Sequence, residues 1–171
     1  MREKYSVGII TLSDRGARGE RTDESGPLIR ERLLREGVYE ICEELLLSDD
    51  PKQLEAELIR MADRCGWNLI LTTGGTGFAP RDHAPEATEA VITKRCPGIA
   101  EYLRMRSMEI TPRGMLSRGA AGIRNRTLIV NLPGSPKAVR ESLEWLLPSL
   151  EHGLGILLER ARDCAEREAQ N

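Results

Sequence analysis

The sequence predicts a single α/β domain, in which a mostly parallel β-sheet is covered by helices on both faces. Short stretches of β-branched and aliphatic residues alternate with longer stretches whose apolar residues recur at helical spacing. The chain has 171 residues, the usual length of one domain, and contains neither internal repeats nor a linker-like segment. We therefore expect residues 1–171 to form one unit, with a frayed and charged tail over residues 160–171.

The composition excludes several classes of protein. Apolar residues make up 40% of the chain and charged residues 30%, which is typical of a globular protein and not of a disordered or membrane-spanning one. The 25 Lys and Arg residues are balanced by 27 Asp and Glu residues, and aromatic residues are scarce, so we expect neither nucleic acid nor a membrane as a partner. The amino terminus, MREKYSVGII, lacks the apolar core and cleavage site of an export signal, which indicates a cytoplasmic location.

The first elements are a strand, a long polar loop and a helix. Residues 5–12 (YSVGIITL) are apolar and partly β-branched, which favours a central strand. The polar loop over residues 13–26 is long for a plain connection, and loops of this kind are often functional. Either Asp23 or Ser25 can cap the helix that follows, and Gly37 should end it.

The remaining elements follow from the same patterns. Residues 39–47 (YEICEELLL) are compatible with helix or strand, and the flanking turns favour a strand. We expect helices over residues 51–65, 83–95, 98–110 and 137–161, strands over residues 68–73 and 127–132, and short mixed segments at residues 115–118 and 122–126. Pro148 lies inside the last helix and should kink or break it. Met105, Met108 and Met115 are expected to fill gaps in the core or in an interface.

The turn TTGGTGFAPRD, which follows the third strand, carries the strongest functional signal in the chain. Gly74, Gly75 and Gly77 let the backbone take positive φ and approach a ligand closely. Successive N–H groups in such a turn can face one anion, which suits phosphate oxygens. Arg81 and Asp82 end the turn with a cation for an anionic ligand and a carboxylate for a divalent metal. The alternative is an ordinary glycine-rich connection.

Polar or glycine-rich turns follow four predicted strands, at residues 13–14, 48–50, 73–75 and 133–135. These turns should meet, because parallel strands bring their carboxyl ends to one edge of the sheet. Asp49 and Asp50 would then lie near Asp82, and a cation would relieve their repulsion. Mg²⁺ fits, since it commonly uses one or two carboxylates together with substrate phosphates. Asp49 and Asp50 can instead simply cap the helix that follows them.

Other phosphate and nucleophile motifs are missing from the sequence. The glycine turn has neither the lysine of the GxxxxGK[ST] loop nor the GxGxxG spacing. His83 and His152 are isolated, and no Ser–His–Asp or Cys–His set is evident. Phosphate chemistry here would therefore depend on positioning and charge neutralisation, without a covalent protein nucleophile.

Four motifs are distinctive when taken together. They are TTGGTG-x-x-PRD-x-x-PEAT over residues 72–88, CPG over 96–98, TPRGMLSR over 111–118 and NLPGSPKAV over 131–139. With them, about residues 6–158 resemble the molybdopterin adenylyltransferase family, which includes bacterial Mog and MoaB proteins and the G domain of gephyrin-like fusion proteins. The resemblance implies a three-layer α/β/α fold, a homotrimer, and transfer of AMP from ATP, with Mg²⁺, to the terminal phosphate of molybdopterin.

The resemblance also implies roles for individual residues. Asp49 and Asp82 correspond to two catalytic aspartates of the family, which act on the metal and the phosphates. The nucleotide site would comprise Gly74, Gly75, Thr76, Gly77, Asp14, Ser25 and Gly26, and the molybdopterin site Ser117, Pro133, Gly134 and Ser135. A molybdenum insertase is an implied partner. The alternatives are a non-catalytic protein that binds molybdopterin or a nucleotide, and a structural trimer.

One departure from the family pattern lies next to Asp82. The family commonly has Val-Thr where this chain has His83 and Ala84. The missing threonine removes a helix cap or a phosphate contact, so the surroundings of Asp82 are expected to differ although the aspartate is retained. The choice between molybdenum and tungsten belongs to a later insertion step.

Overall fold

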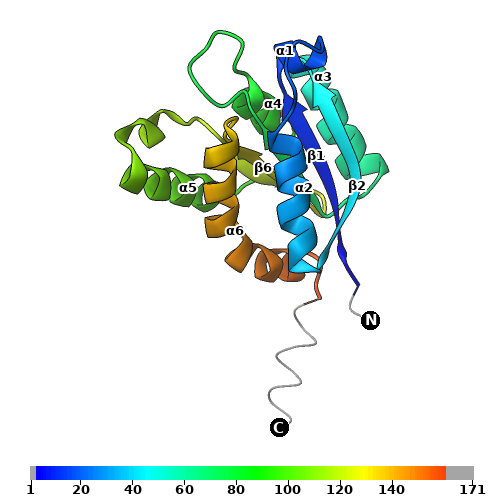
Figure 1. The fold of residues 1–171 in the computed structure, drawn as a ribbon. Coiled ribbons are helices and arrows are strands. Elements are labelled where there is room, and N and C mark those ends of the chain that lie inside the picture. Colours follow the sequence, from blue (N-terminus) through cyan, green and yellow to red (C-terminus); the bar gives the residue numbers. More distant parts are fainter. Residues whose placement is uncertain (1–2, 161–171) are drawn as a thin grey trace, which may run out of the picture.

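The computed structural model describes residues 3–160, which form one six-stranded sheet with helices on both faces (Figure 1). The strands are β1 (Tyr5–Leu12), β2 (Tyr39–Leu47), β3 (Leu69–Thr73), β4 (Lys94–Arg95), β5 (Ala121–Arg124) and β6 (Thr127–Leu132), in the spatial order β2-β1-β3-β6-β5-β4. The first four strands of this order are parallel, and β5 and β4 are antiparallel to their neighbours. The mostly parallel sheet and the central place of β1 are confirmed. The tail predicted for residues 160–171 lies, beyond residue 160, outside the described residues.

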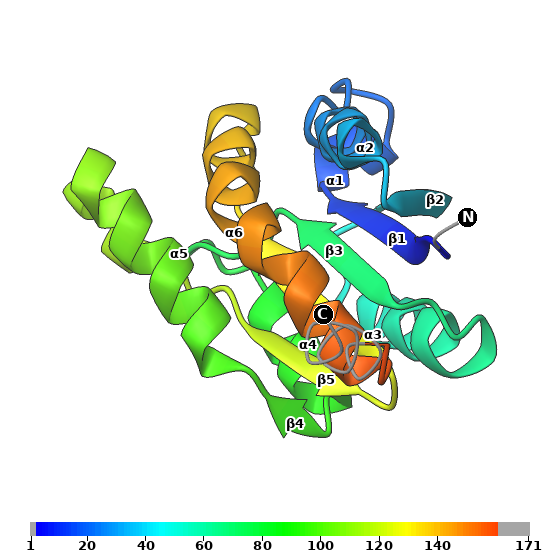
Figure 2. The same cartoon turned by 90° about the horizontal axis from the view of Figure 1, so that it is seen from below.

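The helices form the two outer layers. They are α1 (Asp14–Ala17), α2 (Ser25–Glu36), α3 (Pro51–Ile59) with a π-helical turn (Arg60–Arg64), α4 (Ala84–Val91), α5 (Pro97–Ile110), the 3₁₀ helix η2 (Pro112–Leu116) and α6 (Pro136–Leu157). One apolar core joins α2, α5 and α6 to the sheet, and a second core joins α3 and α4 to its other face. Figure 2 shows α5, α6 and α2 side by side along one face. Within residues 3–160, no helix is long and apolar enough to cross a bilayer.

The two ends of α2 show how local residues determine where a helix begins and ends. Asp23 accepts hydrogen bonds from the backbone N–H groups of Ser25 and Gly26 at 3.0 and 3.1 Å, so Asp23 is the capping side chain of the two that were predicted. Gly37 ends the helix with a φ of 73°, a left-handed conformation that favours glycine. Both ends of α2 are therefore fixed by local chemistry.

Three segments differ from the sequence prediction. Residues 83–95 do not form one helix, because α4 ends at Val91 and Lys94 and Arg95 form β4. Residues 122–126 were expected to be irregular, but most of them belong to β5, which pairs with β4 and β6. Strands of two and four residues are too short to show a period. The loop over residues 13–26 also contains the short helix α1.

Two expectations about the helical layer are corrected. α6 continues through Pro148, because buried leucines on both sides of the proline, Leu147 and Leu150, hold the helix on the core. Of the two predicted outcomes, a break is therefore wrong, and a kink agrees with the change of direction in the orange part of the helix (Figure 1). Met105 and Met108 are 49% and 42% exposed, so they do not fill the core of this chain, and their place in an interface stays a prediction.

Candidate functional site

The carboxyl ends of β1, β2, β3 and β6 meet at one edge of the sheet and surround a cavity of about 540 Å³. This is the end of the sheet where α1 and the loop before α4 lie (Figure 1). The predicted site residues that line the cavity are Asp14, Ser25, Asp49, Gly74, Gly75, Asp82, Gly134 and Ser135. The predicted convergence of the four turns at this edge is confirmed.

Three residues assigned to the nucleotide site lie behind the cavity wall. The carbonyl oxygens of Thr76 and Gly77 accept hydrogen bonds from the backbone N–H and the Nε of Arg118, both on the outer side of the glycine turn. Gly26 packs against Asp23 in the first turn of α2. These residues therefore shape the wall and do not line the cavity.

The residues assigned to molybdopterin are divided between two recesses. Gly134 and Ser135 line the main cavity. Pro133 and Ser117 line a narrow recess of about 50 Å³ between α5 and α6, with Arg104 beside them. The turn over residues 133–135 thus separates the two recesses.

Close backbone contacts explain the glycines of the central turn. Gly74 has a φ of 94°, and a Cβ at this position would lie 2.5 Å from the carbonyl oxygen of Leu12. Gly75 has a φ of 66°, which also favours glycine. A Cβ on Gly134 would lie 3.3 Å from the Cα of Gly74. The end of β1, the glycine turn and the turn after β6 therefore approach one another as bare backbone along the cavity.

The backbone of the glycine turn also takes over the capping of α4. His83 occupies the cap position and makes no side-chain capping bond, and Ala84, where the family pattern has threonine, is the first residue of the helix. The N–H of Ala84 donates instead to the carbonyl oxygen of Gly75 at 3.0 Å. The turn and the helix that follows it are thus tied together without a polar cap.

Asp49 and Asp14 hold each other in place. The backbone N–H of Asp14 donates to Asp49 Oδ2 at 3.0 Å, and the N–H of Asp49 donates to Asp14 Oδ1 at 2.9 Å. The neighbouring Asp50 caps α3 through the N–H groups of Lys52 and Gln53. The sequence left open whether Asp49 and Asp50 cap the helix or face a ligand site. In the structure, Asp50 caps the helix and Asp49 lines the cavity.

The carboxyl group of Asp49 loses its proton less readily than an exposed aspartate does. Its side chain is only 8% exposed, and this burial raises its pKa above the usual range. The charges of Asp14 and Asp82 raise the pKa further, whereas the hydrogen bond from Asp14 and the charge of Arg81 lower it. Arg81 Nε lies 3.8 Å from Asp49 Oδ2. A positive charge near Asp49, such as that of Arg81, therefore favours the ionised form of its carboxylate.

Asp82 forms two hydrogen bonds within the loop that carries it. Its Oδ2 accepts the N–H of Ala79 at 2.9 Å, and its N–H donates to the carbonyl oxygen of Ala79 at 2.8 Å. A Cβ on Gly77 would lie 2.9 Å from the same Oδ2, so the glycine leaves space for the carboxylate. Within residues 3–160, no hydrogen bond to Asp82 Oδ1 is found, and Asp82 lines the cavity. One carboxylate oxygen thus fixes the loop, and the other remains available to a ligand.

The rim of the cavity is held by hydroxyl groups. Thr11 donates through Oγ1 to Asp23 Oδ2 at 2.7 Å, which fixes the carboxylate that caps α2. Ser25 donates through Oγ to the carbonyl oxygen of Gly134 at 2.9 Å, which joins the start of α2 to the turn after β6. Ser25 therefore has a structural contact in addition to its place on the cavity wall.

Charges of both signs surround the cavity. The carboxylates are those of Asp14, Asp23, Glu24, Asp49 and Asp82, and the arginines are Arg15, Arg18, Arg21 and Arg81. Arg18 is engaged by Glu20 in an exposed ion pair. Such a wall offers a cation its oxygen ligands and offers a polyanion its countercharges. Together with the bare glycine backbone, it can hold phosphate groups next to a divalent metal.

Residues 8–152 match the MoCF_biosynth family, which is described as a probable molybdopterin binding domain. The chain belongs to the MoCF_biosynth family. It is 41% identical over 170 residues to a molybdopterin adenylyltransferase of Helicobacter pylori, with 96% of this chain and 94% of that protein covered. It is 40% identical to gephyrin of Dictyostelium discoideum, covering 91% of this chain and 23% of that protein. The structure matches that of the molybdopterin biosynthesis enzyme MoaB of Thermus thermophilus with a TM-score of 0.85 and 50% identity, covering 90% and 96% of the two chains.

In this MoCF_biosynth domain, the sequence did not predict the contacts of Arg118. The residue lies in the TPRGMLSR motif, but its contacts are with the loop over residues 77–82 and with Glu86, more than thirty positions away. Asp23 was expected only to cap α2, and it also lines the cavity. Hydrogen bonds over such separations leave no local pattern in the sequence.

Proposed function

We propose that this chain adenylylates molybdopterin in molybdenum cofactor biosynthesis, using ATP as the AMP donor. The observation that carries the proposal is the presence of Asp49, Asp82 and the Gly74–Gly75 backbone in the wall of one cavity that is also rich in arginine. The names of its relatives in Helicobacter pylori and Escherichia coli, both molybdopterin adenylyltransferases, support it. The cavity has the charge and the open backbone that two phosphate-bearing substrates need.

In the proposed reaction, an oxygen of the terminal phosphate of molybdopterin attacks the α-phosphorus of ATP. A new P–O bond forms to AMP, and the bond to the β-phosphate breaks with its electron pair leaving on pyrophosphate. The attacking phosphate is largely ionised at neutral pH, so the protein needs no strong general base. The arginines reduce the repulsion between the two anions, and the Gly74–Gly75 turn orients phosphate oxygens through its backbone.

The donor set fits Mg²⁺, which Asp49 and Asp82 would hold. When bound, Mg²⁺ supplies charge neutralisation at the phosphates. Among residues 3–160, no group of three or more His, Cys, Asp or Glu side chains is placed to hold a metal. Mg²⁺ commonly takes one or two carboxylates and completes its shell with substrate phosphates and waters. Asp14 keeps Asp49 oriented, and Ala79 keeps Asp82 oriented.

We further propose that the molybdopterin site continues from the main cavity toward the recess beside it. Gly134 and Ser135 would meet the phosphate end of the substrate, because they share the cavity with the two aspartates. Ser117 and Pro133 would contact the pterin end in the recess between α5 and α6. Thr76, Gly77 and Gly26 would support the nucleotide site from behind its wall.

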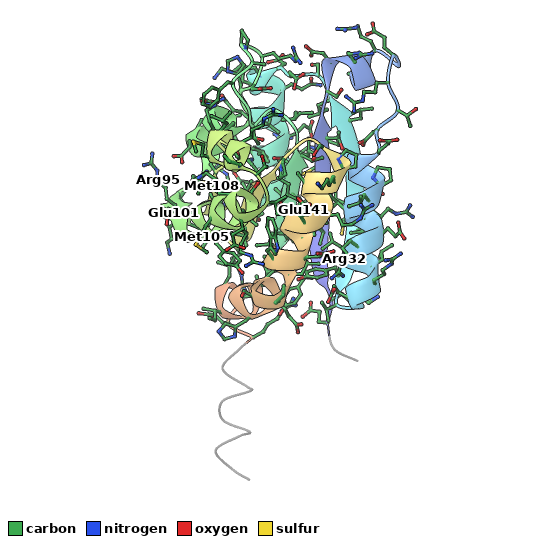
Figure 3. The ribbon with its side chains drawn as sticks, turned by 60° about the vertical axis from the view of Figure 1, so that its left-hand side comes forward. Arg32, Arg95, Glu101, Met105, Met108 and Glu141 are labelled. Carbon is green, nitrogen blue, oxygen red and sulfur yellow. The ribbon has the colours of Figure 1, made fainter. Side chains whose placement is uncertain are left out.

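A homotrimer in the cytoplasm completes the proposal, with a molybdenum insertase as the protein that receives the product. Support for self-association comes from apolar side chains that are exposed on α5 and η2. They are Tyr102, Met105, Met108, Ile110, Met115 and Leu116, here called the α5–η2 patch. Figure 3 shows Met105 and Met108 on the outer side of α5, near Glu101. Exposed apolar patches of this kind commonly mark protein contacts.

The proposal is tested by incubating the purified protein with ATP, Mg²⁺ and molybdopterin and measuring adenylylated molybdopterin and pyrophosphate. Asp82→Asn is the informative variant, because the amide oxygen can still accept the N–H of Ala79 while the charge is lost. We expect most AMP transfer to disappear without loss of folding. Asp50→Asn is the matched control, since Asn caps a helix as well as Asp does, and it should retain activity. Binding of both substrates by the parent without product would instead indicate the non-catalytic alternative.

A further inference from the structure

Arg118 holds the loop that carries Asp82 from outside the cavity. Its Nε donates to the carbonyl oxygen of Gly77 at 2.8 Å, and its Nη2 donates to the carbonyl oxygen of Asp82 at 2.7 Å. Its backbone N–H donates to the carbonyl oxygen of Thr76 at 2.9 Å. One residue from the segment after η2 thus binds both ends of the loop over residues 77–82.

The same guanidinium is tied to α4. Arg118 Nη1 forms an ion pair with Glu86, in the first turn of that helix, and this pair lowers the pKa of Glu86. Arg118 lines a shallow recess between α4 and α5 and does not line the main cavity. A ligand held by Asp49 and Asp82 is therefore separated from Arg118 by the loop backbone.

The loop has no other anchor of comparable extent among the described residues. Inside it, Ala79 and Asp82 exchange hydrogen bonds, which fix the loop's shape but not its position relative to the sheet. Its position depends on the ends, where Gly75 caps α4 and where Arg118 contacts Gly77 and Asp82. The one further tie among residues 3–160 is the long ion pair between exposed Arg81 and Asp49, at 3.8 Å. A guanidinium presents five N–H donors on three nitrogens in a fixed plane, whereas an ammonium presents three donors on a single nitrogen and cannot reach acceptors so far apart.

We propose that Arg118 is a positioning residue for the adenylyl transfer reaction, fixing the loop that carries the carboxylate of Asp82 in the wall of the cavity that Asp49 also lines. The inference rests on the proposed function for its kinetic consequence, but the positional claim stands on the hydrogen bonds alone. Replacing Arg118 changes no side chain that lines the cavity, because Arg118 is not among them, but it removes the brace that holds the loop of Asp82. The expected defect is therefore in turnover and in the demand for Mg²⁺, more than in substrate binding.

The kinetic test compares Arg118→Gln and Arg118→Lys with the parent. A misplacement of about 1 Å at a reacting group can cost about 100-fold, so we expect kcat of Arg118→Gln to fall about 10- to 100-fold. The KM for ATP should change less than about threefold, and the Mg²⁺ concentration for half-maximal activity should rise, since the loss lies in positioning and not in uniform binding. Arg118→Lys should be intermediate, because a lysine reaches fewer of the acceptors.

Arg95→Gln is the matched control. Arg95 lines the same recess, carries the same charge and pairs with Glu89 of α4 at 2.8 Å. Among residues 3–160, it has no hydrogen bond or ion pair with the loop over residues 77–82. Its kinetic constants and its response to Mg²⁺ should equal those of the parent. An equal loss in both variants would assign the effect to the charge of the recess and overturn the positioning role.

Hydrogen exchange gives a readout that does not depend on activity. In the protein without ligands, the amides of Ala79 and Asp82 are protected by their mutual hydrogen bonds. Arg118→Gln should accelerate exchange in residues 76–83, with the amides of β3 and β6 unchanged, and Arg95→Gln should have no effect. Unchanged exchange in the loop, or faster exchange throughout the sheet, would contradict the proposal. A parent that forms no adenylylated product would refute the proposed function, and the exchange result would still decide whether Arg118 positions Asp82.

Discussion

Replacing Gly26 with alanine should destabilise the protein by moving Asp23, although neither backbone conformation nor a ligand contact requires glycine there. A Cβ at this position would clash with Asp23 Oδ2 and would lie 2.8 Å from Thr11 Oγ1. Asp23 accepts hydrogen bonds from Thr11, Ser25 and Gly26 itself. The alanine thus forces the carboxylate away from all three donors.

The size of the effect follows from those contacts. Loss of the helix cap costs about 1 kcal/mol. The hydroxyl of Thr11 is buried, with the residue 6% exposed, and losing its acceptor costs about 1–3 kcal/mol. Alanine returns at most about 1 kcal/mol through its better helix propensity. The net loss of about 1–3 kcal/mol corresponds to a fall in Tm of about 2–12 °C for a chain of this size.

The assay is thermal unfolding with an ATP titration alongside it. Gly98→Ala is the control, because Gly98 is also the second residue of a helix, and no atom lies within 4 Å of the position of its added Cβ. That variant should melt at or slightly above the temperature of the parent. If Gly26→Ala had the same melting temperature as Gly98→Ala and bound ATP with the affinity of the parent, the predicted clash at Gly26 would be wrong.

Three further predictions concern the cavity and the α5–η2 patch. Asp14→Asn removes a charge that raises the pKa of Asp49, so that pKa should fall and the acid limb of AMP transfer should move to lower pH. In the parent, the free energy of unfolding should fall as pH rises from the ordinary carboxyl pKa to the raised pKa of Asp49. This fall should be smaller in Asp14→Asn. If the variant had the same pH profiles of activity and unfolding as the parent, Asp14 would not be a cause of the raised pKa of Asp49. Gly75→Val places a β-branched side chain at a φ of 66° and should abolish ATP binding in a calorimetric titration, whereas normal affinity would exclude the backbone cradle. Met105→Glu should reduce the mass measured by light scattering if the α5–η2 patch joins subunits, and Ile156→Glu, exposed on α6, should leave the mass unchanged; equal masses for both variants and the parent would exclude the patch.

Much of the fold and the centre of the site could be read from local sequence. The predicted strand ranges 5–12, 39–47, 68–73 and 127–132 match β1, β2, β3 and β6 to within one residue. Three of these strands are buried and need consecutive apolar residues, whereas the edge strand β2 was recognised from its flanking turns. The parallel arrangement then requires their carboxyl ends to share one edge. From that requirement alone, Asp49, Asp82 and the Gly74–Gly75 turn were expected to share a cavity.

Contacts between segments that are far apart in the chain could not be predicted from local sequence patterns. The helix expected over residues 83–95 gives way to β4 because β5 offers it a partner, and this pairing depends on residues 121–124. The methionines of α5 have an apolar pattern typical of a core position, but α5 contributes Leu103 to the core, and Met105 and Met108 are exposed. Apolar spacing indicates which side of a helix is apolar, and it does not indicate whether the same chain covers that side.

By itself, the sequence determined the α/β class, the strand ends that meet and the family to which the chain belongs. Only the tertiary structure decided that Asp49 is locked by Asp14, that Asp50 is a helix cap, and that Arg118 braces the loop of Asp82. The physical reason is that secondary structure and burial follow from neighbouring residues, whose spacing is fixed by the backbone. Hydrogen bonds between loops depend on where the packed core places their ends, and residues far apart in the chain share no such spacing.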